Sequence, residues 1–490
     1  MAVDTTHNLY GKHQRHIKLV RDTLEGGDAL RGGGYIPRLP SQEPQEYHAY
    51  IHRAPFVNFT DKLLDNLTGL AFAKSPVKDI PQQLENLLHD IDLDKKTDID
   101  LAQNIVQELF ITSRIGALVS FTQGGINEPV SGEVAQRYFR PFVKLYPHES
   151  IINWKIRNNQ TAQVVLMEFV EVDVDEFETA EQEQYLVLDL FEGKYRARRF
   201  IKDDNGDYIV IDEVFPTRNG QTLDYIPFFC ANPMELSLTP TKPPLYNMAE
   251  INIHHFRSNI ELGHMLFNMV GFLFGKGINE ENATIKIGST VANFYREENA
   301  DIKYVALSSD QAKPYENKIK EFEENMGAIG AEFLKNSKQS QISKETLQIQ
   351  TAGDKASLIS VVETASRLML QVLQEMALWT DENPEDISYQ INTDFNLNKL
   401  DAQKLKTYAE LNQMNIFSDY DIYFKLKEYE EIDKELTYQD WLEYRQNSFS
   451  GLDLNLQNDN KEKDERDREE DEHLLNTLRY TLGLASVGSV

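Results

Sequence analysis

The stretch "KPPLYNMAEINIHHFRSNIELGHMLFNMVGFLFGKG", residues 242–277, decides the fold. Pro243 and Pro244 can open a helix, because proline is tolerated in a first turn, where its missing amide hydrogen is not needed. The sequence predicts one long helix that ends at residues 275–277. Every third or fourth position is apolar or small, which gives a heptad seam typical of helix packing. The seam consists of Ala249, Ile253, Phe256, Ile260, Gly263, Phe267, Val270 and Phe274.

A second helix with the same pattern follows Pro314. Its seam consists of Tyr315, Ile319, Phe322, Met326, Ile329 and Phe333. The segment between the helices, residues 278–307, contains three short strand candidates, "ATIKIGS", "VANFYRE" and "IKYVAL". We therefore expect the helices to pair as an antiparallel hairpin with a small β-containing insertion at its tip.

The first helix has more apolar surface than one partner helix can cover. From residue 262 onward its other faces are apolar as well. These further apolar residues are Leu262, Met265, Leu266, Met269 and Leu273. Identical hairpins packed sideways in a head-to-tail arrangement would cover this surface and close into a ring. The sequence therefore predicts a ring-forming protein.

The rest of the chain combines helices with a sheet-rich region. Residues 141–229 contain β-branched and aromatic runs separated by turn residues, which predict an antiparallel sheet. The other expected elements are a buried strand at 113–121, a strand at 387–396, and helices at 43–73, 97–112 and 355–379. We predict an α+β fold whose C-terminal part is helical and acidic.

Charge and composition limit the classes of function. The formal net charge is −29, from 79 acidic and 50 basic residues. This sign argues against a nucleic-acid clamp, which neutralises phosphates with Lys and Arg, but it allows a passage through which DNA slides. The lone Cys230, the absence of a secretory layout at the N-terminus and an apolar stretch too short to span a bilayer predict a soluble cytoplasmic protein.

The adjacent His254 and His255 are candidate metal ligands that fail on geometry. Adjacent residues project about 100° apart on a helix, so they cannot both reach one ion. Glu250 with His254, and Glu261 with His264, have ligand spacing but gain no third ligand. We expect interhelical or solvent-facing polar contacts, and we predict no catalytic, metal or cofactor site. An acidic cytoplasmic hydrolase remains an alternative, because residues distant in sequence can converge.

Six blocks of sequence, in this order between residues 34 and 379, resemble the portal proteins of tailed bacteriophages. They are similar to the group long catalogued as a phage family of unknown function. The blocks are "YIPRLP…EYHAYIHRAPFVNFTDKLLDNLTGLAFAKSP", "LFITSRIGALVSF", "RPFVKLYPHESIINWK", "IPFFCANP", "PPLYNMAEINIHHFRSNIELGHMLFNMVGFLFGKG" and "GDKASLISVVETASRLMLQVLQEMALWT".

The resemblance implies a dodecameric ring at one vertex of the capsid. It would be the channel for genome packaging and ejection, and would dock the terminase large subunit and later the head-tail adaptor. Other implied partners are the major capsid and scaffolding proteins and double-stranded DNA that passes without sequence-specific contacts. The implied location is the virion, after assembly in the host cytoplasm, with no membrane contact. Another ring-forming head-tail adaptor is the alternative.

The parts of a portal-type fold can be carried onto this chain by residue range. They are a wing at 1–242, stem helices at 243–276 and 313–334, a clip at 277–312, a tunnel loop at 335–353, a long wing helix and strand at 354–400, and a helical crown at 401–490. Lys335, Lys338 and Lys344 of the loop are candidate phosphate contacts, with ordinary solvated lysines as the alternative.

Packing between stem helices or between subunits is expected at eight residues. These are Ile253, Phe256, Ile260, Gly263, Phe267, Phe322, Met326 and Phe333. Gly263 is expected to let neighbouring helices approach closely, because it has no side chain.

Overall fold

The computed structural model describes most of residues 2–393 and short parts of residues 395–449. Outside the described residues lie 1, 39, 41, 122–139, 204, 269–271, 277–300, 306–309, 311, 334–357, 394, 396–406, 409–410, 413–417, 429–431, 433–435 and 450–490. The chain divides into two compact units, Met1–Thr393 and Asp394–Val490. The first unit combines helices with antiparallel sheets, so the predicted α+β class is confirmed.

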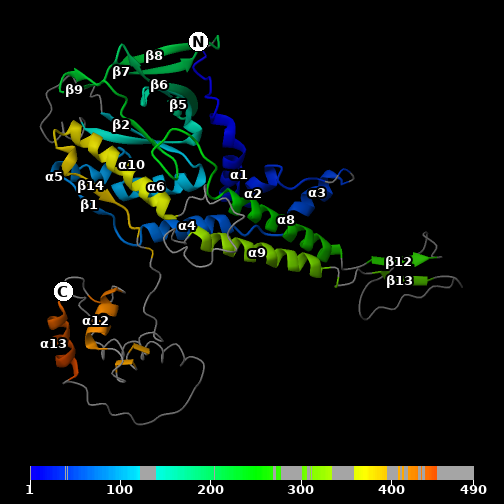
Figure 1. Cartoon of the computed structure of the whole chain (residues 1–490). Helices are drawn as coiled ribbons and strands as arrows, with labels where there is room; N and C mark the ends of the chain where they lie inside the picture. The colour runs from blue at the N-terminus through cyan, green and yellow to red at the C-terminus, as the bar shows by residue number, and fades with distance from the viewer. Residues whose placement is uncertain are drawn as a thin grey trace. The chain divides into compact units, whose positions relative to one another are not determined.

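Short helices make up the N-terminal part of the first unit (Figure 1). Their bounds are η1 Tyr10–His13, α1 Gln14–Glu25, α2 Gly27–Gly32, α3 Pro44–Ile51, α4 Phe59–Ala71, α5 Gln82–Glu85, η2 Leu88–Asp90 and α6 Asp98–Ile111. A capping box starts α6, because the Thr97 side chain accepts from the backbone N–H of Asp100 while the Asp100 carboxylate accepts from the backbone N–H of Thr97. The predicted helix at 97–112 is confirmed.

Two antiparallel sheets form the sheet-rich region that the sequence predicts. The five-stranded sheet is a meander of β4 Ile151–Arg157, β5 Gln160–Asp173, β6 Thr179–Phe191, β7 Lys194–Lys202 and β8 Tyr208–Val214. The three-stranded sheet has the order β11 Phe228–Ala231, β2 Ile115–Phe121 and β3 Pro141–Pro147. Apolar residues of both sheets share one core, in which Leu118 and Tyr146 meet Leu166, Leu186 and Leu188.

Three short strand pairs complete the described strands of this unit. They are β1 Val77–Asp79 with β14 Ser388–Gln390, β9 Thr217–Arg218 with β10 Gln221–Thr222, and β12 Phe272–Lys276 with β13 Asp301–Val305. The 3-10 helices η3 His148–Ser150 and η6 Pro384–Asp386 lie between larger elements. Among the described residues of the strand expected at 387–396, three form β14, and residues 394 and 396 lie outside the described part.

Three long helices follow the sheets in sequence: α8 Tyr246–Asn268, α9 Lys313–Phe333 and α10 Leu358–Trp379. α10 packs against β2, β3, β11 and α6, and so joins the three-stranded sheet to the N-terminal helices. Arg114 is fully buried beside this sheet, where its guanidinium donates to the backbone carbonyls of Leu238, His148 and Ile151. None of the helices in the described parts of the chain is both long and apolar enough to cross a membrane.

The second unit contains the helices α12 Asp419–Glu428 and α13 Tyr438–Phe449. Their core consists of Ile422, Tyr423, Leu426, Ile432 and Trp441. The helical character predicted for the C-terminal region is confirmed for these residues. The boundary between the units lies at residue 394, whereas the sequence placed it at residue 401.

Candidate functional site: the helical hairpin

The candidate site is the hairpin formed by α8 and α9, which pack against each other along their lengths (Figure 1). The strands β12 and β13, which follow α8 and precede α9, pair antiparallel from Phe272 opposite Val305 to Lys276 opposite Asp301. The predicted order of helix, β-containing insertion and helix is therefore confirmed. The candidate strand "IKYVAL" overlaps β13, while "ATIKIGS" and "VANFYRE" lie outside the described residues.

The predicted end of the first helix is wrong. α8 ends at Asn268, and the last seam residue, Phe274, belongs to strand β12 instead, while Val270 lies outside the described residues. Two phenylalanines alternate with leucine and glycine in this strand, a pattern that suits a strand as well as a helix seam. Pairing with β13 gives the backbone of Phe272–Lys276 the hydrogen bonds that it would otherwise make inside a longer helix. This segment can therefore form a strand.

The seam of α8 faces the N-terminal helices. Ile253, Phe256 and Ile260 are buried in a cluster with residues of α2, α3 and the loops beside them, and the described cluster contains no residue of α9. These three residues thus pack on the N-terminal helices, and their packing against the second seam or a neighbouring subunit stays a prediction. A heptad pattern identifies a helix face that needs cover, but it does not identify the partner.

Buried polar contacts hold α8 to the N-terminal region. The Asn252 side-chain oxygen accepts from the backbone N–H of Thr60 at 3.1 Å, and its amide donates to the carbonyl of Val57 at 2.9 Å. Arg257 donates through Nε to the carbonyl of Tyr35 at 2.6 Å. These contacts hold α8 against the N-terminal region, because leaving a buried amide or guanidinium without a partner would cost folding free energy.

Gly263 permits a close approach, but to the same chain. A Cβ atom at this position would lie 2.8 Å from the carbonyl oxygen of Arg53, a residue that follows α3. The Arg53 guanidinium lies over the Phe267 ring, with 3.5 Å between its central carbon and the ring centroid. Phe267 is nevertheless 56% exposed, and its neighbour Leu266 is 50% exposed. The end of α8 therefore keeps apolar surface that the chain leaves in contact with solvent.

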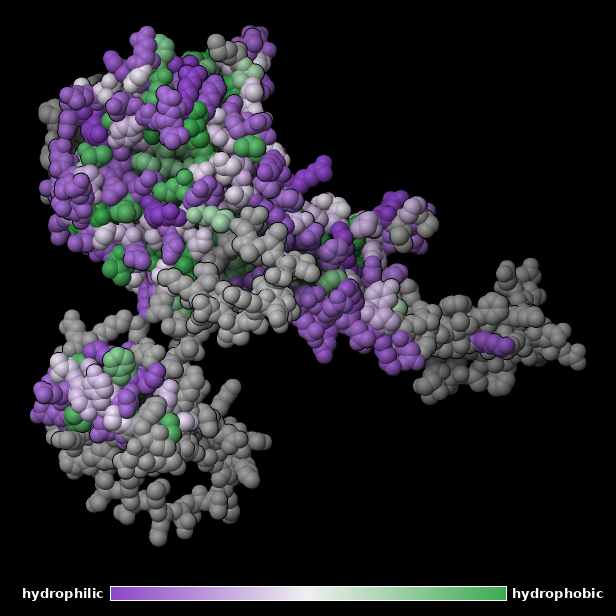
Figure 2. Space-filling model, viewed as in Figure 1, coloured by the Kyte–Doolittle hydropathy of each residue, from purple (hydrophilic) through white to green (hydrophobic). Residues whose placement is uncertain are grey.

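The seam of α9 is only partly covered. Met326 is buried, while Phe322 lies near His254 with 6.1 Å between ring centroids. Phe333 meets Phe110 of α6 edge to face at 5.8 Å. The other seam residues, Tyr315, Ile319 and Ile329, are half-buried. Mostly hydrophilic residues cover the face of the hairpin seen in Figure 2.

The two adjacent histidines make different contacts, as the sequence predicts. The ring of His254 stacks near Phe322, whereas His255 is buried and its Nε2 lies 3.4 Å from the Glu323 carboxylate of α9. Burial lowers the pKa of His255, although Glu323 opposes this effect. Among the described residues no three His, Cys, Asp or Glu side chains gather as a metal site. The candidate lysines 335, 338 and 344 lie outside the described residues.

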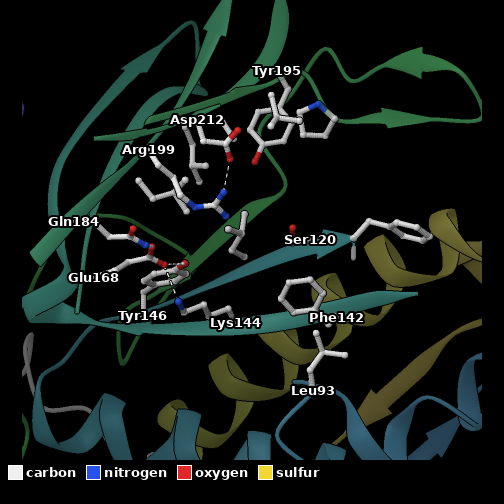
Figure 3. Close-up of a pocket in the computed structure, with 17 residues that line it drawn as sticks. Leu93, Ser120, Phe142, Lys144, Tyr146, Glu168, Gln184, Tyr195, Arg199 and Asp212 are labelled. Atoms are coloured by element: carbon white, nitrogen blue, oxygen red, sulfur yellow. Dashed lines mark hydrogen bonds and ion pairs between the residues drawn. The ribbon is translucent and has the colours of Figure 1, made fainter. Parts of the chain in front are cut away.

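A second feature is a cavity of about 470 Å³ between the two sheets (Figure 3). Leu118, Leu186 and Leu188 form part of its apolar lining. Its charged groups are paired with each other: Lys144 with Glu168 at 2.7 Å and Arg199 with Asp212 at 2.5 Å. The charges of these four residues therefore compensate each other within the cavity.

Glu168 is the most densely bonded group of this cavity. Its carboxylate accepts from Lys144, from the Tyr146 hydroxyl and from the Gln184 amide, each at 2.7 Å. Burial by itself would raise the pKa of Glu168, but these hydrogen bonds and the charge of Lys144 lower it. A stable carboxylate with all its partners in place is a structural element rather than a proton donor or acceptor poised for catalysis.

Sequence reasoning missed this network. Its members come from β3, β5 and β6, so they meet only after the two sheets pack. A polar residue at an inward position of the apolar run "VVLMEF" was the one available signal for Glu168.

Comparisons with known proteins match the region of the hairpin. A family model described as a domain of unknown function (DUF4055) matches residues 244–380, which contain α8, α9 and α10 and less than a third of the chain. No curated protein matches the chain. A solved chain from the "Virion of native gene transfer agent (GTA) particle" is similar to this chain at 11% identity and a TM-score of 0.32, covering 80% of this chain and 96% of that chain. The matched family segment thus begins in the turn before α8 and ends one residue after α10.

Proposed function

We propose that this chain is the portal protein of a tailed bacteriophage. Twelve copies would form a ring at one capsid vertex, through which the terminase drives DNA and to which the head-tail adaptor later binds. The proposal gives the chain a structural role and assigns it no catalytic residue, metal or cofactor. The sequence resemblance across six ordered blocks is its starting point.

The observation that carries the proposal is the incompletely covered hairpin. Within α9 only Met326 is buried, and Leu266 and Phe267 at the end of α8 expose half or more of their surface. Apolar residues at the end of a long helix need a partner, and identical hairpins placed side by side around an axis would supply one. The order of helix, paired strands and helix is the order that a stem with a clip requires.

The charge of the chain fits a channel that DNA must leave as well as enter. A net charge of −29 keeps phosphate contacts few, and each Lys or Arg contact would add affinity and slow sliding. We assign the few contacts to Lys335, Lys338 and Lys344. Replacing all three with Ala should shorten the packaged genome or release it early, and unchanged packaging and retention would remove this assignment.

Immunogold labelling of particles tests the role directly. An antibody against the chain should label a single vertex on capsids, including capsids that have not yet received DNA. Label on empty capsids separates a portal from a head-completion adaptor, which joins after packaging. Label along the tail, over the whole shell or only on filled capsids would contradict the proposal.

A further inference from the structure

Strands β5 and β6 continue beyond the five-stranded sheet as a two-stranded ribbon. β4 pairs with β5 only up to Leu166, and β7 pairs with β6 only from Gln184 onward. β5 and β6 stay paired with each other out to Asp173 opposite Thr179. Residues 168–183, named here the acidic ribbon, therefore have no described strand on either edge. Such a ribbon is only marginally stable alone, and its free edges are suited to a partner.

One face of the acidic ribbon carries charges of a single sign. No Lys or Arg occurs between residues 158 and 193. Glu171 lies directly opposite Glu181, and Asp173 and Glu183 share the same face. Like charges at directly opposed positions destabilise a strand pair. A surface that brings cations to this face would stabilise the ribbon.

The other face of the ribbon carries Val170 and Val172, opposite Gln182 and Ala180, and two further apolar residues are exposed near its tip. Val174 is 59% exposed and Phe177, at the tip, is 91% exposed. Acidic residues surround Phe177 at positions 175, 176 and 178. The tip of the ribbon thus exposes an aromatic ring among acidic side chains.

A complementary surface exists elsewhere on the same chain. Lys12, His13, His16 and Lys242 interact with one another, and Arg15 precedes His16 on α1. These five residues, named here the basic cluster, lie on η1, α1 and the segment before α8. The His13 and His16 Nδ1 atoms are 3.3 Å apart, and His16 lies 4.4 Å from the ring of Tyr246. The Nζ of Lys242 lies 4.1 Å from the centroid of the same ring.

Three cations of the basic cluster are exposed to solvent. Lys12, Arg15 and Lys242 are exposed. Burial, followed by the positive charges of Lys12, His16 and Lys242, lowers the pKa of His13, because these basic groups crowd one another. Glu250 of α8 is the acidic residue that acts on His16. An acidic partner would relieve this crowding, and the aromatic rings of His16 and Tyr246 suit an aromatic tip.

We propose that the acidic ribbon of one copy docks on the basic cluster of the next copy, with Phe177 against the rings of His16 and Tyr246. The two surfaces differ, so the contact is head-to-tail and can close into a ring. Opposite charges would set the register of neighbouring subunits and speed their encounter. This inference rests on the proposed ring and names a contact by which it forms.

Cross-linking between singly substituted subunits tests the contact. Cys230 is the only cysteine and is buried, so introduced thiols are the accessible ones. Full-length Phe177→Cys and Arg15→Cys proteins, mixed and assembled, should form a heterodimeric product with a short bismaleimide. Each protein alone should form none. A Phe177→Cys product with itself, or no product from the assembled mixture, would overturn the proposal.

Charge reversal gives a second, independent readout. Glu171→Lys with Glu181→Lys should lower the ring fraction about tenfold, as should Lys12→Glu with Arg15→Glu. The four changes in one chain should restore rings. Glu192→Lys with Asp207→Lys, which change exposed acidic residues in other turns, control for net charge and should leave assembly intact.

The outcomes separate this inference from the proposed function. If the wild-type chain forms rings and both charge-reversed variants form them equally well, the ribbon contact is overturned and the portal proposal stands. A wild-type chain that stays monomeric would overturn both. Rings that form normally in Lys12→Glu with Arg15→Glu but no longer retain DNA would assign the basic cluster to nucleic acid, and the ribbon contact would fall.

Discussion

Two helices of nearly equal length, α10 and α9, show how differently parts of this chain are covered. In α10, Leu358–Trp379, apolar residues such as Val361, Leu368 and Met376 are fully buried within the unit. In α9, Lys313–Phe333, Met326 is the one buried residue. Both helices have long apolar repeats, so the difference lies in their partners. α10 packs between α6 on one side and the strands β2, β3 and β11 on the other, whereas α9 has α8 on one side and needs a second surface.

An acidic residue of each helix shows the same difference in burial. Glu375 of α10 is buried, and its carboxylate accepts from the Tyr225 hydroxyl at 2.7 Å and from the Trp379 indole at 3.2 Å. Burial raises its pKa despite these bonds. Glu323 of α9 has a half-exposed side chain beside His255. Glu375 thus makes its hydrogen bonds inside the unit, whereas Glu323 keeps about half of its side chain exposed to solvent.

The largest expected effect is a loss of folding stability in acid, caused by the buried His148. Burial, and then the charge of Arg114, lowers the pKa of His148 to about 3 in the folded chain, against about 6.5 when unfolded. The unfolded state binds the proton first as pH falls, so folding stability is lost between pH 6.5 and pH 3, by about 4 kcal/mol.

Urea unfolding of the full chain at several pH values measures this loss. The variant His148→Phe keeps a ring against Tyr10, whose centroid lies 5.4 Å from that of His148, but it cannot titrate. It should lose less stability in acid than the wild type. Equal losses in the two proteins would show that His148 does not cause the loss of stability at low pH.

Truncating α10 should cost more than any single change on α9. Leu368→Ala removes a fully buried side chain, so the free energy of unfolding should fall by about 3 kcal/mol. Chemical denaturation of the dissociated subunit measures the change. A loss below about 1 kcal/mol would mean that α10 is not packed as described.

Gly263→Leu should destabilise the subunit by about 2 kcal/mol, because the new Cβ meets the carbonyl of Arg53. Gly327→Leu on α9 is the matched control, since a Cβ there has no atom within 4 Å. The control should be neutral or slightly stabilising, because leucine favours a helix more than glycine does. Equal effects at the two positions in thermal unfolding would contradict the close approach at Gly263.

Ile319→Asp on α9 should have the smallest effect on the subunit and a clear effect on assembly. Ile319 is half-buried in the single chain, so the dissociated subunit should lose under about 1 kcal/mol. If a neighbouring subunit covers this position, a buried unpaired carboxylate would block the contact. Size-exclusion chromatography should show smaller species, and an unchanged profile would show that this face of α9 stays exposed.

Sequence periodicity located α8, α9 and α10 because each has a long apolar repeat with proline near the start of the first two. It misplaced the end of α8, since "FLF" suits a helix seam or a strand equally well until β13 pairs with it. It did not predict that Ile253, Phe256 and Ile260 pack on the N-terminal helices, because a seam does not specify what covers it. The Glu168 network and the acidic ribbon depend on strand register, which was beyond the sequence pattern.

The proposed ring requires that other copies of this chain cover its hairpin. Native mass spectrometry of the freshly purified full-length chain, over a range of concentrations, measures this directly. We expect a closed assembly near the mass of a dodecamer, which Ile319→Asp reduces to smaller species. A wild-type chain that remains monomeric at the highest concentration would contradict the proposed ring.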